Sequence, residues 1–215
     1  MELLSVNVGV PRQNPWKRDP QLTGIDKRPA DGPIAVTAPG PKGTGAVGLA
    51  GDRVYDVKHH GGDDQAVYAY AREDLDYWET RLGRALPCGV FGENLTTRGL
   101  DVNGALIGER WRIGSTVVLE VSCPRIPCGT FRGWIAERGW LKTFTAERRA
   151  GAYLRVVEPG DISAGDRVEV ISRPDHDVSV ALTFRAIHDH ALLPRLSAAD
   201  ALPSELRELA REHRA

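Results

Sequence analysis

Short runs in which apolar and polar residues alternate predict strands over most of the chain, because successive side chains of a strand point to opposite faces. Gly and Pro lie in nearly every gap between these runs, where they end regular structure. The predicted strands are residues 3–10, 34–37, 53–58, 116–121, 153–157 and 167–171. The pattern therefore indicates a mainly β (α+β) domain.

One segment in the first half follows a helical spacing instead. Between residues 72 and 84, Leu75, Trp78 and Leu82 recur on one face. Glu73 and Asp74 fall in the first turn, where the helix dipole favours anions. We expect an amphipathic helix packed on the strands.

The pattern changes after Asp177, where alternating runs stop. Residues 179–188 and 202–213 predict helices, the second with Pro203 near its start, and residues 192–201 are compatible with a third. We therefore expect two parts, a β-barrel-like domain at 1–174 and a helical segment at 175–215. The second part is too short to hold its own core, so it must pack on the first part or on a partner.

Composition narrows the classes of function. The chain has 215 residues, 41% of them hydrophobic, so it can bury a core without a disulfide. A net charge of -1 disfavours nucleic acid and acidic membranes as partners. No apolar run approaches the ~18 residues of a membrane span. Three cysteines and no recognisable signal peptide predict a cytoplasmic location with free thiols.

Residues 121–131, V-S-C-P-R-I-P-C-G-T-F, carry two of the three cysteines. Their spacing is not that of a zinc knuckle, because no second cysteine pair follows. Pro124 and Pro127 stiffen the loop after a predicted strand, and Arg125 can stabilise a thiolate at Cys128. A nucleophile or a soft-metal ligand fits this setting, while a buried inert cysteine is the alternative. Cys123 leaves oxidation between the two thiols open.

Two further motifs carry polar groups on glycine turns. K-H-H-G-G-D-D-Q, residues 58–65, places His59 and His60 next to Gly61 and Gly62. Neighbouring residues of an extended chain point to opposite faces, so at most one histidine faces a given site. F-G-E-N-L-T, residues 91–96, offers Asn94 to a heterocycle edge, and an ordinary Asx turn is the alternative.

Basic pairs offer a third kind of site. Guanidinium groups recognise phosphate, so Arg148, Arg149 and Arg155 around the Gly151 turn predict a phosphate cradle. Lys27 and Arg28 form another pair. Whether these groups converge in space is not visible in the sequence.

Taken together, five motifs resemble the MOSC domain family, in its YiiM-like branch, which is linked to resistance to N-hydroxylated purines. They are T-G-I-D-K-R-P-A-D-G-P, G-D with V-K-H-H-G-G-D-D-Q-A-V-Y-A-Y, F-G-E-N-L-T, P-R-I-P-C and R-x-G-A-Y-L-R-V. The helical segment resembles the three-helix end of that branch. The resemblance implies a β-barrel-like fold with peripheral helices that binds the molybdenum cofactor, a pterin carrying a dithiolene and a phosphate.

The resemblance also implies roles for residues. Cys128 matches the cysteine whose thiolate ligates molybdenum, and His59 or His60 is the expected proton shuttle. The expected cofactor-binding residues are Thr23, Lys27, Arg28, Gly61, Gly62, Asn94, Arg125, Arg149 and Arg155. Among these, the four basic residues other than Arg125 are expected near the pterin phosphate.

The implied function is an oxidoreductase that reduces N-hydroxylated small molecules of the hydroxylaminopurine type to amines. Without a G-x-G-x-x-G motif or an iron–sulfur cysteine set, the chain is expected to receive electrons from a flavin- or iron–sulfur-containing protein. Two alternatives remain, a sulfur carrier that uses a Cys128 persulfide and a module that binds or delivers the cofactor without turnover. The sequence does not identify the physiological substrate or the electron-donor protein, and it is compatible with a homodimer.

Overall fold

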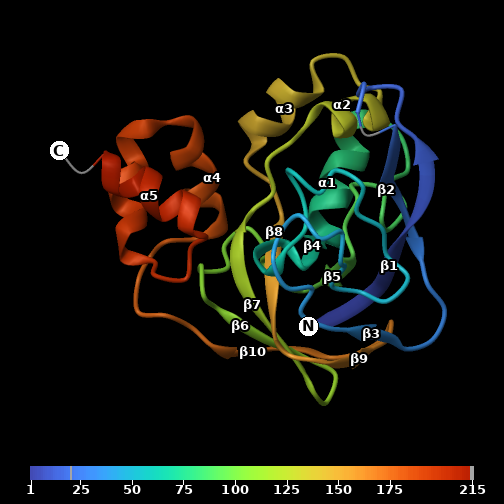
Figure 1. Ribbon diagram of the computed structural model, residues 1–215, viewed down its shortest axis with the longest axis horizontal. Coiled ribbons are helices and arrows are strands. Elements are labelled where there is room, and N and C mark those ends of the chain that lie inside the picture. Colours follow the sequence, from blue (N-terminus) through green and yellow to red (C-terminus); the bar gives the residue numbers. More distant parts are fainter. Residues whose placement is uncertain (20, 214–215) are drawn as a thin grey trace.

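The computed structural model describes residues 1–19 and 21–213 and contains a mixed α/β fold built on one large sheet (Figure 1). The strands are β1 Glu2–Gln13, β2 Leu22–Pro29, β3 Ile34–Val36, β4 Val67–Ala71, β5 Leu95–Arg98, β6 Arg110–Ile113, β7 Val117–Pro124, β8 Ala152–Glu158, β9 Gly160–Ile162 and β10 Val168–Ser172. The helices are η1 Asp63–Gln65, α1 Arg72–Leu82, α2 Gly129–Ile135, α3 Trp140–Glu147, α4 Val180–His188, η2 His190–Ala198 and α5 Ser204–Glu212.

The main sheet has eight strands in the order β10-β6-β7-β8-β4-β5-β1-β2, and β3 pairs with β9 separately. All pairs are antiparallel except β4 with β5. The backbone of Leu3 in β1 exchanges hydrogen bonds with Gly165 and Asp166, just before β10. The sheet therefore curls back on itself without becoming a closed barrel, which confirms the predicted mixed, barrel-like class.

Two apolar clusters hold the fold together. The larger one lines the inside of the sheet and includes Trp111 and Leu119. The smaller one is aromatic and lies between α1, α2 and α3, where Trp78, Phe91 and Trp140 are fully buried. The ring centroids of Trp78 and Trp140 are 4.8 Å apart in an edge-to-face arrangement, which is one of the preferred geometries of aromatic pairs. The aromatic cluster thus anchors α2, which begins next to Cys128.

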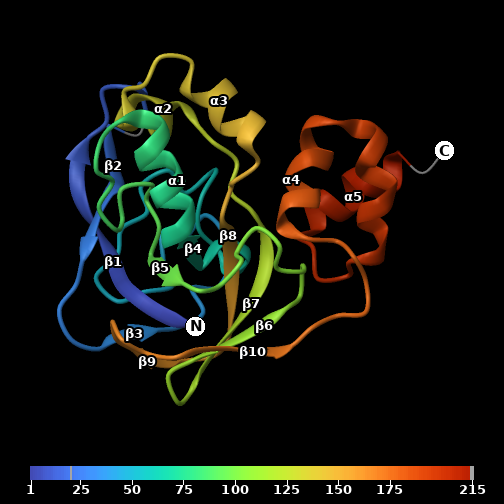
Figure 2. The same cartoon turned by 180° about the vertical axis from the view of Figure 1, so that it is seen from behind.

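The C-terminal helices form a compact group beside the sheet, next to β7 and α3 in both views (Figures 1 and 2). Val180 and Ala186 of α4 are buried in the same cluster as the sheet's interior side chains. Ser179 caps α4 by accepting a hydrogen bond from the Leu182 amide. The helical segment therefore packs on the sheet, while the boundary at residue 174 stays a prediction.

Several elements differ from the prediction. The predicted strand at 53–58 is wrong, because the chain turns there and the Asp56 carbonyl accepts hydrogen bonds from the His59 and His60 amides. The strand β4 was not predicted, since its five residues are all buried and show no alternation. Helices α2 and α3 were also missed, although their aromatic residues recur at helical spacing. The predicted helix at 72–84 is confirmed as α1, which ends at Gly83 with φ 64°.

Within residues 1–19 and 21–213, no helix combines the length and the apolar character that crossing a bilayer requires.

Candidate functional site

Cys128 lies in the stiff loop between β7, which ends at Pro124, and α2, which begins at Gly129. Its backbone is extended, with φ -120° and ψ 173°. Because Pro127 fixes its own φ, the loop presents the thiol with little backbone freedom. The predicted presentation of Cys128 just past a strand end is therefore confirmed.

The surroundings of Cys128 favour its thiolate. Burial alone would raise the pKa of this thiol, but hydrogen bonding from His60, the charge of Arg125 and the Phe131 backbone amide outweigh it and lower the pKa to about 6. At neutral pH the thiol is therefore mostly ionised. The same stretch holds a contrasting thiol, because burial raises the pKa of Cys123 to about 12.

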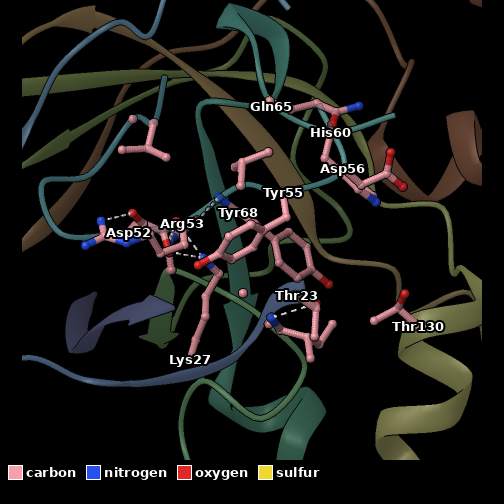
Figure 3. A pocket seen from close by; sticks show the side chains of 18 of the residues that line it. Thr23, Lys27, Asp52, Arg53, Tyr55, Asp56, His60, Gln65, Tyr68 and Thr130 are labelled. Atoms are coloured by element: carbon pink, nitrogen blue, oxygen red, sulfur yellow. Dashed lines mark hydrogen bonds and ion pairs between the residues drawn. The ribbon is translucent and has the colours of Figure 1, made fainter. Parts of the chain in front are cut away.

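A cavity opens at Cys128, and Figure 3 shows the side chains of its wall. They come from the segment after β1, from β2, the long loop before β4, β4, the turn before β5, the cysteine loop, the start of α2 and β8. The polar and titratable residues of the lining are Asn14, Thr23, Lys27, Asp52, Arg53, Tyr55, Asp56, His60, Gln65, Tyr68, Asn94, Arg125, Cys128, Thr130 and Tyr153. We call this the first cavity.

Arg125 is the most unusual of these side chains, since it is only 4% exposed and forms no ion pair within the described part of the chain. Its guanidinium carbon stands 3.7 Å from the centroid of the Phe131 ring and 5.4 Å from that of Tyr68. One terminal nitrogen, Nη1, has no hydrogen-bond partner. A buried cation that has no carboxylate partner and a terminal nitrogen without an acceptor is costly, so the arrangement favours an anionic ligand in the first cavity.

Asp52 is the centre of a second polar group on the cavity wall. Lys27 Nζ donates to both of its carboxylate oxygens at 2.6 and 2.5 Å, and Asn94 Nδ2 donates at 2.8 Å. Burial raises the pKa of Asp52, but Lys27 and Asn94 more than offset this and lower it. Asn94 Oδ1 accepts from the Tyr68 amide. Lys27 and Asn94 thus face the cavity with their polar atoms already engaged.

Asp56 organises the histidine turn. Burial would raise the pKa of Asp56, but hydrogen bonds from Lys17 and His59 lower it to about 2, so the carboxylate stays ionised. His59 Nδ1 lies 2.9 Å from Asp56 Oδ1, and the His59 side chain is 58% exposed. Of the two histidines, only His60 lines the first cavity.

The structure brings seven of the predicted site residues to the first cavity and leaves five outside its lining. The seven are Thr23, Lys27, His60, Gly61, Asn94, Arg125 and Cys128, and the five are His59, Arg28, Gly62, Arg149 and Arg155. Gly62 stands just behind the wall, with no room for a side chain, because an added Cβ would lie 2.8 Å from the Lys42 amide nitrogen.

The outlying arginines are held by carboxylates elsewhere. Arg28 pairs with Asp26 at 3.0 Å, Arg149 pairs with Asp74 and stacks on Tyr77, and Arg155 pairs with Asp64 at 2.6 Å. Each guanidinium group is already paired with a carboxylate, so binding a phosphate would require breaking that ion pair. The predicted phosphate cradle is therefore not assembled at this cavity.

Other wall residues were not predicted as site residues. Arg53 and Asp56 fall in the segment predicted as a strand, and Asp52 directly precedes it. Gln65 and Tyr68 belong to the motif around the histidines, but no role was assigned to them. Arg53 donates to the carbonyl oxygens of Gly51 and Asp52 and pairs with no carboxylate among the described residues. The only available signal was the G-D-R turn that precedes the histidine motif.

A second cavity of about 420 Å³ opens on the other side of the cysteine loop. It shares Asp56, His60, Gln65, Cys128 and Tyr153 with the first cavity. Its remaining wall is formed by Lys17, Lys42, His59, Cys123, Pro124, Ile126, Pro127, Ile187, Pro203, Glu205 and Leu206.

A family model for the MOSC domain matches residues 56–169, more than half of the chain and most of the site. The chain belongs to the MOSC domain family. MOSC domains are associated with the molybdenum cofactor. Among the described residues, no three His, Cys, Asp or Glu side chains gather in a way that could hold a metal ion by themselves.

Curated relatives agree with this assignment. The Bacillus subtilis protein YflK, described as uncharacterized, is 33% identical over 85% of this chain and 79% of its own length. YiiM of Escherichia coli is 31% identical over 74% of this chain and 67% of its own. A Gibberella moniliformis protein named reductase is 32% identical over 77% of this chain. The matched region makes up only 28% of that longer protein.

Solved structures extend the likeness over the whole chain. YiiM from Geobacillus stearothermophilus has a TM-score of 0.78 and 27% identity, covering 100% of this MOSC chain and 99% of that one. YiiM from Escherichia coli has a TM-score of 0.72 at 24% identity, covering 100% and 92%, and shows the same fold. The predicted resemblance to the YiiM-like branch is confirmed.

The first cavity fits the cofactor that this family is associated with. The molybdenum cofactor carries a soft metal, sulfur donors and a phosphate, so it needs a thiolate and a cation. The ionised Cys128 thiol is a soft ligand, and the unpaired Nη1 atom of buried Arg125 is a donor without an acceptor. The donor set is therefore of the required kind.

Proposed function

We propose that this MOSC protein is a molybdenum-cofactor-dependent reductase of N-hydroxylated compounds. The observation that carries the proposal is the meeting, at one cavity, of a thiol with a lowered pKa and a buried cation, Arg125, that has no carboxylate partner among the described residues and whose Nη1 atom has no acceptor. A reductase-named relative at 32% identity supports an oxidoreductase. Free Cys88, Cys123 and Cys128 support a reducing, cytoplasmic setting.

The residues that would hold the cofactor are those of the first cavity. Cys128 Sγ would be the protein's soft ligand to the metal, and Arg125 would meet an anionic part of the cofactor. Lys27 is already neutralised by Asp52. Arg53, which has no carboxylate partner within the described residues, is the remaining cation of the lining and would meet the phosphate.

The proposed reaction is R–NHOH + 2 e⁻ + 2 H⁺ → R–NH₂ + H₂O, in which the N–O bond breaks. The bound cofactor supplies the two-electron chemistry. The protein's part is to supply a proton to the departing hydroxyl, and His60 is placed to do so, because it lines the cavity together with Cys128, whose pKa it lowers. Asp56, the neighbour whose carbonyl accepts from the His60 amide, fixes the turn that carries this ring.

Electrons have to reach this site from outside the chain. We propose a flavin- or iron–sulfur-containing reductase as the donor, because the sequence carries neither a dinucleotide motif nor an iron–sulfur cysteine set. The isolated chain should therefore show little turnover with a nicotinamide nucleotide alone. Steady-state assays with and without a chemically reduced viologen dye measure this, and fast turnover with NADH alone contradicts it.

The decisive experiment compares Cys128→Ala with Cys88→Ala, both expressed in a host that makes the cofactor. Elemental analysis should find molybdenum in the wild-type chain and in Cys88→Ala, and almost none in Cys128→Ala. The rate of hydroxylaminopurine reduction should parallel the molybdenum content of each variant. Cys88 is a suitable control because it is a free thiol that lines neither cavity. Full metal loading and activity in Cys128→Ala would overturn the proposal.

One observation also favours a second function. A thiol with a lowered pKa can carry a persulfide to another protein, so Cys128 suits a sulfur carrier as well. A labile added sulfur on Cys128 by mass spectrometry, without molybdenum, would select that function. Tight cofactor binding with no turnover under any donor would select a binding or delivery module instead.

A further inference from the structure

A third cavity, of about 270 Å³, opens between α3 of the MOSC domain and α4 of the C-terminal segment, two helices that are neighbours in Figure 2. Its wall shares no residue with the first or the second cavity. The lining consists of Thr145, Ala146, Arg148, Phe184, Arg185, His188 and Asp189. Two arginines and a histidine therefore meet in a space that the proposed reaction does not use.

Arg148 is the member of the predicted phosphate cradle that has no partner. The residue before it, Glu147, pairs with Arg81 at 3.0 Å, and the residue after it, Arg149, pairs with Asp74. Arg148 itself forms no ion pair or side-chain hydrogen bond within the described part of the chain. Its guanidinium group thus lines the third cavity with all of its donors open to a ligand.

The backbone of Arg148 is also unusual. This residue caps the C-terminal end of α3 with φ 58° and ψ 26°, in the left-handed region. Glycine adopts this conformation at no steric cost, whereas a residue with a Cβ atom is strained there. Strained residues of this kind gather at ligand-binding sites, where the side chain compensates for the strain. An arginine therefore stands where glycine would give the more stable turn.

The facing cations come from α4. Arg185 and His188 lie in its last turn, three residues apart and so on one face of the helix. His188 packs edge-to-face on the buried ring of Phe184, with ring centroids 4.9 Å apart, which orients the imidazole. Arg185 has no carboxylate partner among the described residues.

Asp189 is the one carboxylate in the wall as far as the structure describes it. It caps the helix η2, where its side chain accepts a hydrogen bond from the Ala191 amide at 3.3 Å. Two arginines against this single aspartate leave the wall with a net positive charge even when His188 is neutral. The electrostatics of the third cavity therefore favour an anion.

We propose that the third cavity binds a small phosphate-bearing anion, with Arg148 and Arg185 as its cationic partners. The two guanidinium groups come from the ends of different helices, and together they hold oxygens of one phosphoryl group or of two adjacent ones. The Thr145 hydroxyl and an N–H of His188 add further donors. The volume of about 270 Å³ is just below the roughly 300–1,000 Å³ of drug-sized sites, which suits a diphosphate or a nucleoside monophosphate. The bound anion links the helical segment to the MOSC domain.

Isothermal titration calorimetry with diphosphate, AMP and adenosine tests this site. Arg148→Gly and Arg185→Gln should each weaken the binding of diphosphate at least about tenfold, the effect of losing one charge-assisted contact. Arg138→Gln removes an exposed arginine outside the wall and should leave the affinity within about twofold. Tighter binding of AMP than of diphosphate assigns the site to a nucleotide, the reverse order assigns it to a free diphosphate, and both support the proposal.

Thermal unfolding separates ligand binding from a purely structural role. Arg148→Gly relieves the left-handed strain, so its Tm without anion should rise by about 2 °C. Diphosphate at about a hundredfold its Kd should raise the Tm of the wild-type chain by at least about 5 °C. The same concentration should raise the Tm of Arg148→Gly and Arg185→Gln by no more than about half as much, because their affinity is lower.

Four results would overturn the proposal. Diphosphate and AMP bind neither the wild-type chain nor its variants, or the affinity is the same in Arg148→Gly and Arg185→Gln as in wild type. The second result would leave both arginines as ordinary cations at helix C-termini. A loss of affinity in Arg125→Met would place the anion in the first cavity instead, and adenosine binding as tightly as AMP would show that phosphate contributes nothing. None of these results depends on molybdenum loading or on reductase activity.

Discussion

The end of β7 and the loop that follows it hold two thiols five residues apart with opposite character. Cys123 is buried, and burial raises its pKa to about 12. Cys128 is also largely enclosed, yet hydrogen bonding from His60 and the charge of Arg125 lower its pKa to about 6. The surrounding donors and charges, and not the cysteine motif, therefore decide which of the two thiols is ionised.

The largest expected effect is a direct contrast between these two thiols. At pH 7 iodoacetamide should alkylate Cys128 at least about a hundredfold faster than Cys123, because only the thiolate reacts and Cys123 is shielded. Peptide mapping by mass spectrometry of the cofactor-free chain measures both rates. Comparable alkylation rates at the two residues would contradict the difference in their pKa values.

The next effect concerns the hydrogen bond that lowers the pKa of Cys128. This pKa lies below that of an ordinary thiol, so the thiolate is present above about pH 6 and is lost as the pH falls through that value. His60→Ala should move the midpoint of the alkylation rate upward by at least about one pH unit. His59→Ala is the matched control, since His59 points to Asp56 and solvent. Equal midpoints in both variants would contradict the role of His60.

A smaller effect is expected from Arg125→Met. The midpoint of Cys128 alkylation should rise by less than in His60→Ala, and molybdenum loading should fall. In the cofactor-free chain the free energy of unfolding should change by no more than about 1 kcal/mol, because the cost of burying the guanidinium is removed together with its attraction to the Cys128 thiolate and its contact with the Phe131 ring. Urea denaturation measures this, with Arg132→Met on exposed α2 surface as the control. A strongly destabilised Arg125→Met chain would indicate a structural role instead.

The smallest effect should come from Tyr153→Phe. Burial raises the pKa of Tyr153 to about 12, so its hydroxyl is neutral at physiological pH. Removing that hydroxyl should shift the Cys128 midpoint by no more than a few tenths of a pH unit. The same alkylation profile measures it, and a shift as large as that of His60→Ala would show that the charge balance around the thiol is wrongly assigned.

Much of the fold was predictable from local patterns. Alternation identified β1, β7, β8 and β10, and the 3.6-residue spacing identified α1. The end of the alternating runs after Asp177 and the helix-start signals at Pro203 identified the C-terminal helices. The failures have physical reasons. Strand β4 is buried on both faces, so its sequence shows no alternation of apolar and polar residues. Residues 53–58 form a turn, and several of their polar side chains line the first cavity.

The candidate site was predictable to a different degree. The proline-flanked Cys128 and the neighbouring Arg125 could be recognised, because a loop's stiffness and a nearby charge are local properties. The ion-pair partners of the other basic residues could not be predicted. Arg149 finds Asp74 75 residues away, and Arg155 finds Asp64 91 residues away, so neither is free for phosphate.

The family, most kinds of element and the thiol in a rigid loop follow from residue types and short spacings, which are visible in the sequence. Folding determines that His60 and not His59 lines the first cavity, which cations lack a carboxylate partner among the described residues, and that α4 and α5 contribute to the wall of a second cavity. Burial and pairing depend on side chains that are distant along the chain, and these meet only when the sheet and helices pack.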